Sequence, residues 1–550
     1  MAAGQDTVAA GQDTVASGQD TVVSRSDGKP KPKSAERGPL GHIAEDGVKL
    51  SNQRTGMWAP PAHRLRVLRD RFVHILDPLG KRSGFLGRII AGPYFPLQET
   101  KNGENGHREL ASIFAEIEIE AELVQGRPQE TKSRPAPGAV VHDLTDDEVA
   151  NLLGFAGDML LGSVSGQESV LFRLQSHNKG VLPRNVGIFG TVGSGKSNTS
   201  QVLIEEAAAS GWAVIIVDVE SEYSQMDEPS TEENLFSELE RLERKPAGLN
   251  DFHVYNPASC GGERTDSQAF TLRLADFETS VIAEILHASL PERNALLDCV
   301  EHFEQRARSK MATNELEGLQ GVLDPSPQNV TYTLRSLRDR AGERATRSTD
   351  FMDYAGLSTK LMWLLHSGAF DQPNLSSLDP RQMVQAGRVT AIDVSLSNDI
   401  VKNLVTADLL RKTFAHKVVH SDAPPTLLVI EEAHSFISRE RVQTMQATLQ
   451  MLRNVTRRGR KRWLSMAFVS QQPGHLPPEI FELCNTRIVH TLRSMHNLEA
   501  LMATAGDVGR EIWDRCPLLG AGEAIVTSPQ LKRPVVVSVR PASSRGKFVH

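Results

Sequence analysis

The stretch from Gly190 to Ser197, GTVGSGKS, restricts the fold of this chain more than any other feature. It fits the pattern G-x-x-x-x-G-K-[ST], a loop in which glycines let the backbone approach a chain of phosphates closely. The apolar run at 185–189 predicts a buried strand before the loop, and residues 197–209 predict a helix after it. A chance glycine-rich turn is the alternative, but strand, loop and helix in this order direct successive backbone N–H groups to one point. The sequence therefore predicts a polyphosphate site in an α/β domain.

The polar residues of this loop have separate tasks. Lys196 can reach the β and γ oxygens of a nucleoside triphosphate, and the Ser197 hydroxyl can bind magnesium. We therefore expect ATP and Mg²⁺ as ligands. The residues expected to line the nucleotide are Gly190, Gly193, Ser194, Gly195, Lys196, Ser197 and Asn198.

Length and composition set wider limits. The chain has 550 residues, which suggests about three domains at roughly 150 residues each. Its formal net charge of −7 gives no overall attraction for nucleic acid, so any such binding must come from local basic patches. No apolar run approaches the roughly 20 residues of a membrane span, and the polar amino terminus carries no signal-peptide pattern. Because the four cysteines include no C-x-x-C pair, we expect reduced thiols in a cytoplasmic protein. The lack of a long apolar run predicts that the protein has no membrane partner.

Residues 1–61 are predicted to form a disordered tail. Residues 2–22 hold three near-copies of one heptad, AAGQDTV, AAGQDTV and ASGQDTV, each with one valine and one glycine. Such repeats cannot form the apolar seam of a coiled coil, and the Lys-, Pro- and Ser-rich segment after them is also poor in apolar residues. From 62 to 180 short β-like runs recur, among them 85–91 and 113–123, so we expect a small β-rich domain with the form of a barrel.

Residues 181–550 are predicted to form an α/β core. Its strands are short apolar runs without alternation, which is typical of strands covered on both faces. They are expected at 185–190, 212–219, 252–257, 387–395, 425–431, 463–470, 486–492 and 522–528. Between them, residues 270–375 have a polar, helical pattern that predicts an insertion. The insertion contains the arginines Arg335, Arg338, Arg340, Arg344 and Arg347. They can form a solvated helix face, which we favour, or they can contact DNA.

Hydrolysis of a bound nucleotide also needs an acid that holds magnesium and a base that activates water. Two predicted strands end in acids, one in Asp218 and one in the pair Glu431 and Glu432. We favour the pair, because Glu431 can serve the metal through water while Glu432 polarises the attacking water. The long separation from the phosphate loop leaves room for an intervening strand, as in RecA-like motor ATPases. Asp218 and Glu222 are secondary candidates, for which capping of a strand-end turn is an equal alternative.

Two further side chains follow the acid pair along the sequence. Gln471 ends the strand predicted at 463–470, where its amide would lie beside the γ-phosphate and report its presence. The helical pattern of 440–458 runs into a basic cluster at 457–462. This cluster can be a favourable charge at a helix end on the surface, or Arg457 can be an arginine finger that reaches the nucleotide of a neighbouring subunit.

In these motifs the sequence resembles the HerA branch of the HerA/FtsK ATPases, which are hexameric DNA-translocating motors with an amino-terminal β-barrel. The motifs are NVGIFGTVGSGKSN (185–198), VDVESEY (217–223), LLVIEEAHSFI (427–437), TRRGRKRW (456–463), VSQQP (469–473) and LCNTRIVHTL (483–492). The resemblance covers residues 180–229 and 376–545 well, the insertion loosely, and the region before 180 by position and β content alone.

The resemblance implies a RecA-like P-loop core and a set of roles. Lys196 and Ser197 would bind phosphate and magnesium, and Glu431 and Glu432 would be the acid pair. Gln471 would be the sensor and Arg457 the finger acting in trans, while Arg184, just before the first core strand, is a weaker basic candidate. Glu431 stands where many relatives have aspartate, and its longer carboxylate can still reach magnesium through water.

The function implied by the resemblance is a hexameric, ring-shaped ATPase that moves double-stranded DNA through its pore. Such a motor would work with a nuclease or another effector, in DNA processing or antiphage defence. The residues alone imply only ATP hydrolysis, since the net charge is acidic and no base-reading motif is visible. The alternative is a nucleotide-regulated assembly scaffold that organises an effector enzyme with little translocation. Strong stimulation of ATP turnover by DNA would favour the motor.

Overall fold

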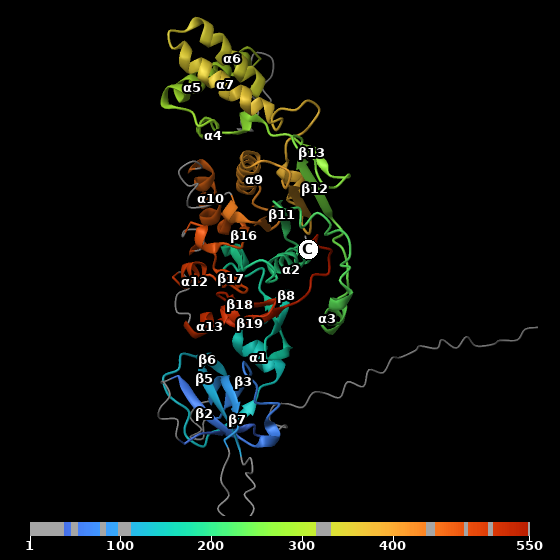
Figure 1. The fold of residues 1–550 in the computed structure, drawn as a ribbon, viewed down its shortest axis with the longest axis vertical. Helices are drawn as coiled ribbons and strands as arrows, with labels where there is room; N and C mark the ends of the chain where they lie inside the picture. Colours follow the sequence, from blue (N-terminus) through green and yellow to red (C-terminus); the bar gives the residue numbers. More distant parts are fainter. Residues whose placement is uncertain are drawn as a thin grey trace, which may run out of the picture.

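The computed structural model describes residues 38–45, 53–76, 84–96, 112–314, 332–435, 446–477, 482–503 and 510–547. The predicted tail at 1–61 lies largely outside the described residues. The molecule is elongated, with a small barrel at one end, a twelve-stranded sheet in the middle and a group of helices at the other end (Figure 1).

The amino-terminal sheet closes on itself as a six-stranded barrel, as predicted from the β-rich pattern. Its strands pair in the order β2-β1-β7-β3-β4-β5, β2 pairs back to β5, and β6 extends from β5. In β5 every second residue from Ile113 to Leu123 is buried, because a strand with one face in the core alternates apolar and polar side chains. The bounds are β1 (Gly41–Ile43), β2 (Arg54–Ala59), β3 (Phe72–Ile75), β4 (Gly84–Tyr94), β5 (Ile113–Val124), β6 (Arg127–Gln129) and β7 (Val140–Asp143).

The limits of the two sheets differ from the predicted boundaries at 61/62 and 180/181. β1 and β2 lie before residue 62 yet belong to the barrel, whereas β8 (Met159–Val164) and β9 (Gln167–Leu174) lie before residue 181 yet belong to the large sheet. β1 is only three residues long, too short to give a strand pattern, and β8 is buried at every position. Burial throughout removes the alternation that distinguishes strands in a sequence.

The large sheet begins with a parallel half and ends with an antiparallel half. Its order is β13-β12-β14-β11-β15-β16-β10-β17-β18-β19-β8-β9, and pairing becomes antiparallel after β17. All eight predicted core strands are present, whereas β13 and β19 were not expected. The bounds are β10 (Val186–Phe189), β11 (Ala213–Asp218), β12 (Phe252–Pro257), β13 (Gln268–Phe270), β14 (Val389–Asp393), β15 (Thr426–Ile430), β16 (Leu464–Ser470), β17 (Thr486–Val489), β18 (Glu523–Thr527) and β19 (Val535–Val539).

The expected intervening strand is β16. It lies between β10, which precedes the phosphate loop, and β15, which precedes the acid pair, and it is parallel to both. Parallel neighbours end at the same edge of a sheet, so the loop, the acids and the residues after Ser470 meet there.

Helices cover the sheet and form the insertion. The group α4 to α7 stands apart at the far end of the molecule and corresponds to the predicted insertion at 270–375 (Figure 1). There Arg338 and Arg344 pair with Asp339 and Asp298 at 2.7 and 3.2 Å. The bounds are α1 (Asp146–Leu153), α2 (Lys196–Ala209), α3 (Phe236–Arg241), α4 (Thr279–Ile285), α5 (Leu290–Asn314), α6 (Leu334–Arg347), α7 (Phe351–His366), α8 (Pro380–Met383), α9 (Asp399–Val419), α10 (Gln446–Arg458), α12 (Met495–Met502) and α13 (Arg510–Asp514).

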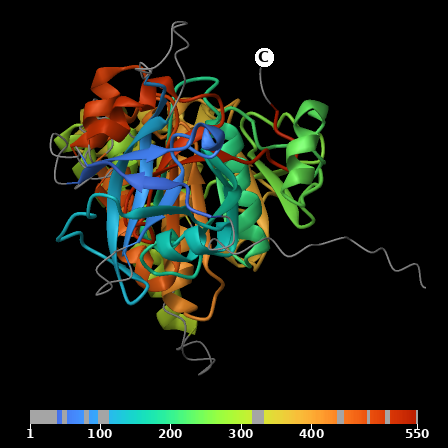
Figure 2. The ribbon, with the colours of Figure 1, turned by 90° about the horizontal axis from the view of Figure 1, so that it is seen from below.

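Polar contacts join the barrel to the antiparallel half of the sheet. Both terminal guanidinium nitrogens of Arg515, which lies in the segment between β17 and β18, donate to Asp70 at 2.7 Å as a bidentate pair. The backbone N–H of Phe72 donates to Oε1 of Gln167 in β9 at 3.0 Å. Seen from below, the barrel lies over the core, and the segment with α3 stands out to one side (Figure 2).

Candidate functional site

The phosphate loop lies between the end of β10 and the start of α2. Gly193 and Gly195 have φ of 73° and 106°, in the left-handed region that glycine adopts without steric cost. A Cβ on Gly190 would lie 2.5 Å from Ser194 Oγ and 2.7 Å from His490 Cβ, so no side chain fits there. The glycines thus bring the loop to the amino terminus of α2 in a form that can enclose phosphate.

Lys196 is the buried cation of this loop. Its side chain is largely covered, and its Nζ donates only a long 3.3 Å hydrogen bond to the carbonyl of Thr191. Burial lowers the pKa of Lys196, and the nearby carboxylates, Glu432 foremost, act in the opposite direction. A buried ammonium with one weak partner is suited to an anionic ligand.

Two of the predicted nucleotide-lining side chains are engaged within the protein. Ser194 Oγ donates to the Thr191 carbonyl at 2.7 Å, which closes the loop on itself. Asn198 turns away from the loop, because its amide donates to the Arg540 carbonyl and its Oδ1 accepts from the Ala542 N–H, both at 2.8 Å. The structure therefore gives Asn198 a role in holding the carboxyl-terminal segment against α2.

The two adjacent acids after β15 lie in different surroundings. Glu431 is 3% exposed and faces Asp218 and Glu222. Burial and these neighbouring carboxylates raise the pKa of Glu431 well above its ordinary value, and burial raises that of Asp218 to about 7. Asp218 also accepts the backbone N–H groups of Glu222 and Tyr223, which is the turn-capping alternative foreseen for it.

Glu432 stands in the more polar position. Burial alone would raise its pKa, but His434, Gln471 and the Lys196 charge together lower it, so an ionised carboxylate is favoured. Its Oε1 accepts from Gln471 Nε2 at 2.5 Å, and its Oε2 lies 3.0 Å from His434 Nδ1. Gln471 thus contacts the candidate base directly, a contact that the sequence did not indicate.

Arg457 lies at the end of α10, where the sequence placed it, although residues 440–445 of the predicted helix lie outside the described residues. Its side chain is exposed and forms no ion pair with another described residue. The preceding Thr456 is linked to the phosphate-loop strand through Asn185, whose amide faces the Thr456 and Leu483 carbonyls at 3.5 and 3.1 Å. This end of α10 therefore packs at the start of β10, at the edge of the sheet opposite to the phosphate loop, and Arg457 is exposed there.

His490, at the end of β17, was missed by sequence reasoning. It is fully buried; its Nδ1 donates to the Glu523 carbonyl at 2.9 Å, and its Nε2 accepts from the Thr199 hydroxyl at 2.8 Å. Burial lowers its pKa to about 4, so the ring is neutral at physiological pH. One feature of the sequence could have indicated His490 as a site residue. It directly follows an apolar run, and in the structure this run is the strand next to the one before the phosphate loop.

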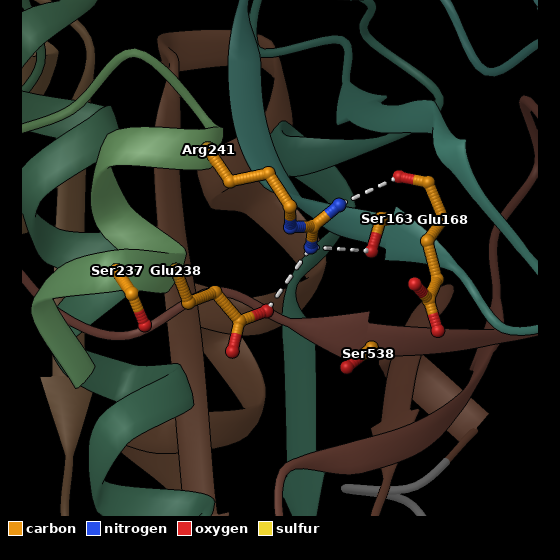
Figure 3. A pocket seen from close by; sticks show the side chains of 6 residues that line it. All are labelled: Ser163, Glu168, Ser237, Glu238, Arg241 and Ser538. Carbon is orange, nitrogen blue, oxygen red and sulfur yellow. Dashed lines mark hydrogen bonds and ion pairs between the residues drawn. The ribbon is translucent and has the colours of Figure 1, made fainter. Parts of the chain in front are cut away.

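The described residues contain no cluster of three or more metal-ligating side chains. A nucleotide-bound Mg²⁺ takes most of its ligands from phosphates and water, so the single hydroxyl of Ser197 and a nearby carboxylate fit such an ion. A separate cavity of about 490 Å³ lies between α3 and the antiparallel half of the sheet. Figure 3 shows Arg241 reaching across it to Ser163 and the Glu168 carbonyl, and none of the predicted site residues lines it.

A phosphate loop, an intervening strand and an acid pair at one edge of a parallel sheet define a P-loop ATPase. The family described as "Helicase HerA, central domain" matches residues 161–413. Over these residues the chain is similar to the HerA ATPases.

Relatives of known name show the same similarity. The DNA double-strand break repair helicase HerA of Sulfolobus acidocaldarius is 24% identical over 431 residues, which span 78% of each chain. The probable HerA of Methanocaldococcus jannaschii is 24% identical over 72% of this chain and 79% of its own.

Among solved structures, VirB4 of Thermoanaerobacter pseudethanolicus has a TM-score of 0.48 at 17% identity, over 70% of this chain and 96% of its own. The plasmid coupling protein TrwB in complex with ADP and Mg²⁺ has a TM-score of 0.41 at 12% identity, over 72% and 94%. Among the described helices, none combines the length and apolar character that a bilayer crossing needs.

Proposed function

We propose that this protein is a ring-forming, ATP-dependent DNA translocase of the HerA type. Two observations carry the proposal. The candidate residues for hydrolysis lie together at one edge of the sheet, and the exposed Arg457 has no ion-pair partner among the described residues of its own chain. A finger of this kind completes the site of a neighbour, which requires a head-to-tail assembly. Relatives named as DNA break repair helicases over more than 70% of both chains support DNA as the substrate track.

In this proposal the nucleotide is held by the loop and by the amino terminus of α2. Lys196 would bind the phosphates and Ser197 the Mg²⁺, with Glu431 contacting the ion through water. Bound Mg²⁺ would neutralise charge on the phosphates during transfer. Glu432 would take a proton from the attacking water, and Gln471, already in contact with Glu432, would link the γ-phosphate to that base.

We extend the proposal to a hexameric ring that acts on double-stranded DNA with a nuclease or another effector, in DNA processing or antiphage defence. The acidic net charge makes a localised basic channel necessary, because DNA affinity rests on Lys and Arg contacts to phosphates. The scaffold alternative shares the same ATPase site and differs in its response to DNA.

One experiment separates the two functions. Particle mass and ATP turnover are measured for the full chain with and without duplex DNA, with Glu432→Gln as the background control. The motor predicts a ring whose turnover rises several-fold with DNA and loses this stimulation at high salt. A ring whose turnover ignores DNA and responds only to an added effector would favour the scaffold, and an active monomer would contradict both.

A further inference from the structure

The carboxylate of Glu432 is contacted at both oxygens, and the proposed mechanism uses only one of these contacts, the one with Gln471. Gln471 donates to Oε1, and the Nδ1 of His434 lies 3.0 Å from Oε2. Glu432 itself has φ of 41°, a left-handed conformation that residues other than glycine rarely adopt. Such a backbone persists only where its surroundings fix it, so the direction of this carboxylate depends on its neighbours.

The ring of His434 is itself fixed. Its Nδ1 also lies 3.2 Å from Ser470 Oγ, which accepts the backbone N–H of Gln472 at 3.1 Å. The contact of Nδ1 with Ser470 Oγ has the geometry of a hydrogen bond, whereas its 3.0 Å approach to Glu432 Oε2 is an ion-pair contact.

These contacts join the ends of two adjacent strands. Glu432 and His434 follow β15, with His434 in a short 3₁₀ turn (Ala433–Ser435), whereas Ser470 is the last residue of β16 and Gln471 follows it. Ser470 is in turn the register partner of Phe189, the last residue of β10 before the phosphate loop. The group Glu432, His434, Ser470 and Gln471 is therefore one connected cluster at the edge that holds the nucleotide.

The adjacent Glu431 shows what this cluster prevents. Glu431 faces the buried acids Asp218 and Glu222, whereas Glu432 is the carboxylate that interacts most with Lys196. A free Glu432 side chain has three rotatable bonds and would sample many directions. We propose that His434 is a positioning residue for ATP hydrolysis, which directs the Glu432 carboxylate toward the Lys196 side of the site through the 3.0 Å contact of its Nδ1 with Oε2. This proposal rests on the proposed role of Glu432 as base.

The test compares His434→Ala with His434→Asn. The asparagine amide can place an N–H close to where Nδ1–H lies, whereas alanine removes the donor. His366→Ala is the matched control, because His366 is an exposed histidine on α7 whose Nδ1 contacts only its own helix at the Met362 carbonyl. The measurements are kcat, the KM for ATP, the Kd of a fluorescent ATP analogue and the melting temperature.

His434→Ala should lower kcat about 10- to 100-fold, a part of the roughly 10²- to 10⁴-fold that a positioned base contributes. KM and the analogue Kd should stay within about twofold, because phosphate binding does not pass through His434. His434→Asn should recover most of kcat, and His366→Ala should match the wild type.

The outcomes that overturn the proposal are distinct from those that overturn the function. If Glu432→Gln is inactive but His434→Ala has a normal kcat, the positioning role is wrong and the site assignment stands. If His434→Asn is as defective as His434→Ala, or if the loss lies in KM alone, the histidine has only a structural role. If Glu432→Gln hydrolyses ATP normally, both the proposed base and this inference fail together.

Discussion

Adjacent carboxylates with opposite surroundings are the main residue-scale feature of this site. Glu431 is turned into a buried acidic group, where its pKa is raised, whereas Glu432 meets donors and a cation that lower its pKa. Only an ionised carboxylate can accept a proton from water. The difference between the two environments therefore favours Glu432 over Glu431 as the base. The sequence does not show this difference, because both residues are glutamates at adjacent positions.

Variants of Lys196 and Glu432 should fail at different steps. Lys196→Ala should lose nucleotide binding or turnover while the melting temperature stays close to that of the wild type, because the loop backbone survives and only the phosphate-directed charge is lost. Glu432→Gln should bind ATP but hydrolyse it slowly, since an amide cannot take up the proton. The measurements are analogue binding and phosphate release. If Glu431→Gln stalls hydrolysis with binding intact and Glu432→Gln does not, the two roles must be exchanged.

The buried His490 predicts a dependence of stability on pH. Its pKa is about 4 in the folded chain and about 6.5 when unfolded. Between these values the unfolded state binds more protons, so the contribution of His490 to stability is present above pH 6.5 and is lost as pH falls toward 4. The loss amounts to roughly 3 kcal/mol. The melting temperatures of wild type and His490→Gln, measured from pH 8 to pH 4, should converge as pH falls, whereas a constant gap would contradict a neutral buried ring.

At the scale of elements, sequence reasoning was reliable where a strand or helix carries its own pattern. The parallel strands were found because uniform apolar runs flanked by turn residues are typical of a buried sheet, and α2 follows directly from the glycine-rich loop. The sequence did not predict contacts between residues that are far apart in the chain. The contact between Gln471 and Glu432, the orientation of Asn198 and the place of β8 in the large sheet all depend on residues that are far apart in the chain.

The carboxyl-terminal segment is tied to α2 by a buried ion-pair network that the sequence did not predict. Arg540 is 1% exposed, and its Nη2 lies 2.8 Å from Glu205 and 2.9 Å from Glu206. Arg540→Ala would remove the buried cation that both carboxylates share, leaving Glu206 with Arg244 and Glu205 with Ser544, and loss of one member of a buried ion pair costs about 3 kcal/mol. Arg545→Ala is the comparison, because its pair with Glu228 is exposed and worth less than about 1 kcal/mol. Denaturant titration of both variants measures the difference, and equal losses would show that Arg540 is not a structural anchor.

At the scale of the whole molecule, the exposed Arg457 makes a prediction about assembly. If it acts on a neighbour's nucleotide, each active site combines Glu432 of one subunit with Arg457 of the next across a head-to-tail interface. Arg457→Ala and Glu432→Gln should each be nearly inactive as pure rings. Rings mixed from the two should recover activity, since about one interface in four pairs both intact residues.

The control for this mixing experiment places both substitutions on one chain and mixes that chain with wild type, which should only dilute the activity. ATP turnover is compared with the wild-type dilution curve, since strict coordination among subunits would mask recovery. If rings exchange subunits and still show no recovery beyond that curve, Arg457 is not a finger acting in trans. If Arg457→Ala alone is fully active, Arg458 and Arg460 become the next candidates.

The large sheet connects regions that serve different ends of the molecule. Its parallel half carries the phosphate loop, and its antiparallel half carries Gln167 of β9, which contacts Phe72 of the barrel. Hydrogen-bonded strands resist shear, so a displacement at the loop edge cannot be absorbed between β10 and β8 as it could in a flexible linker. The barrel is thus attached to the same sheet as the candidate catalytic edge. A small rotation of this sheet during a catalytic cycle would produce a larger displacement at the outer end of the barrel, because displacement grows with distance from the rotation axis.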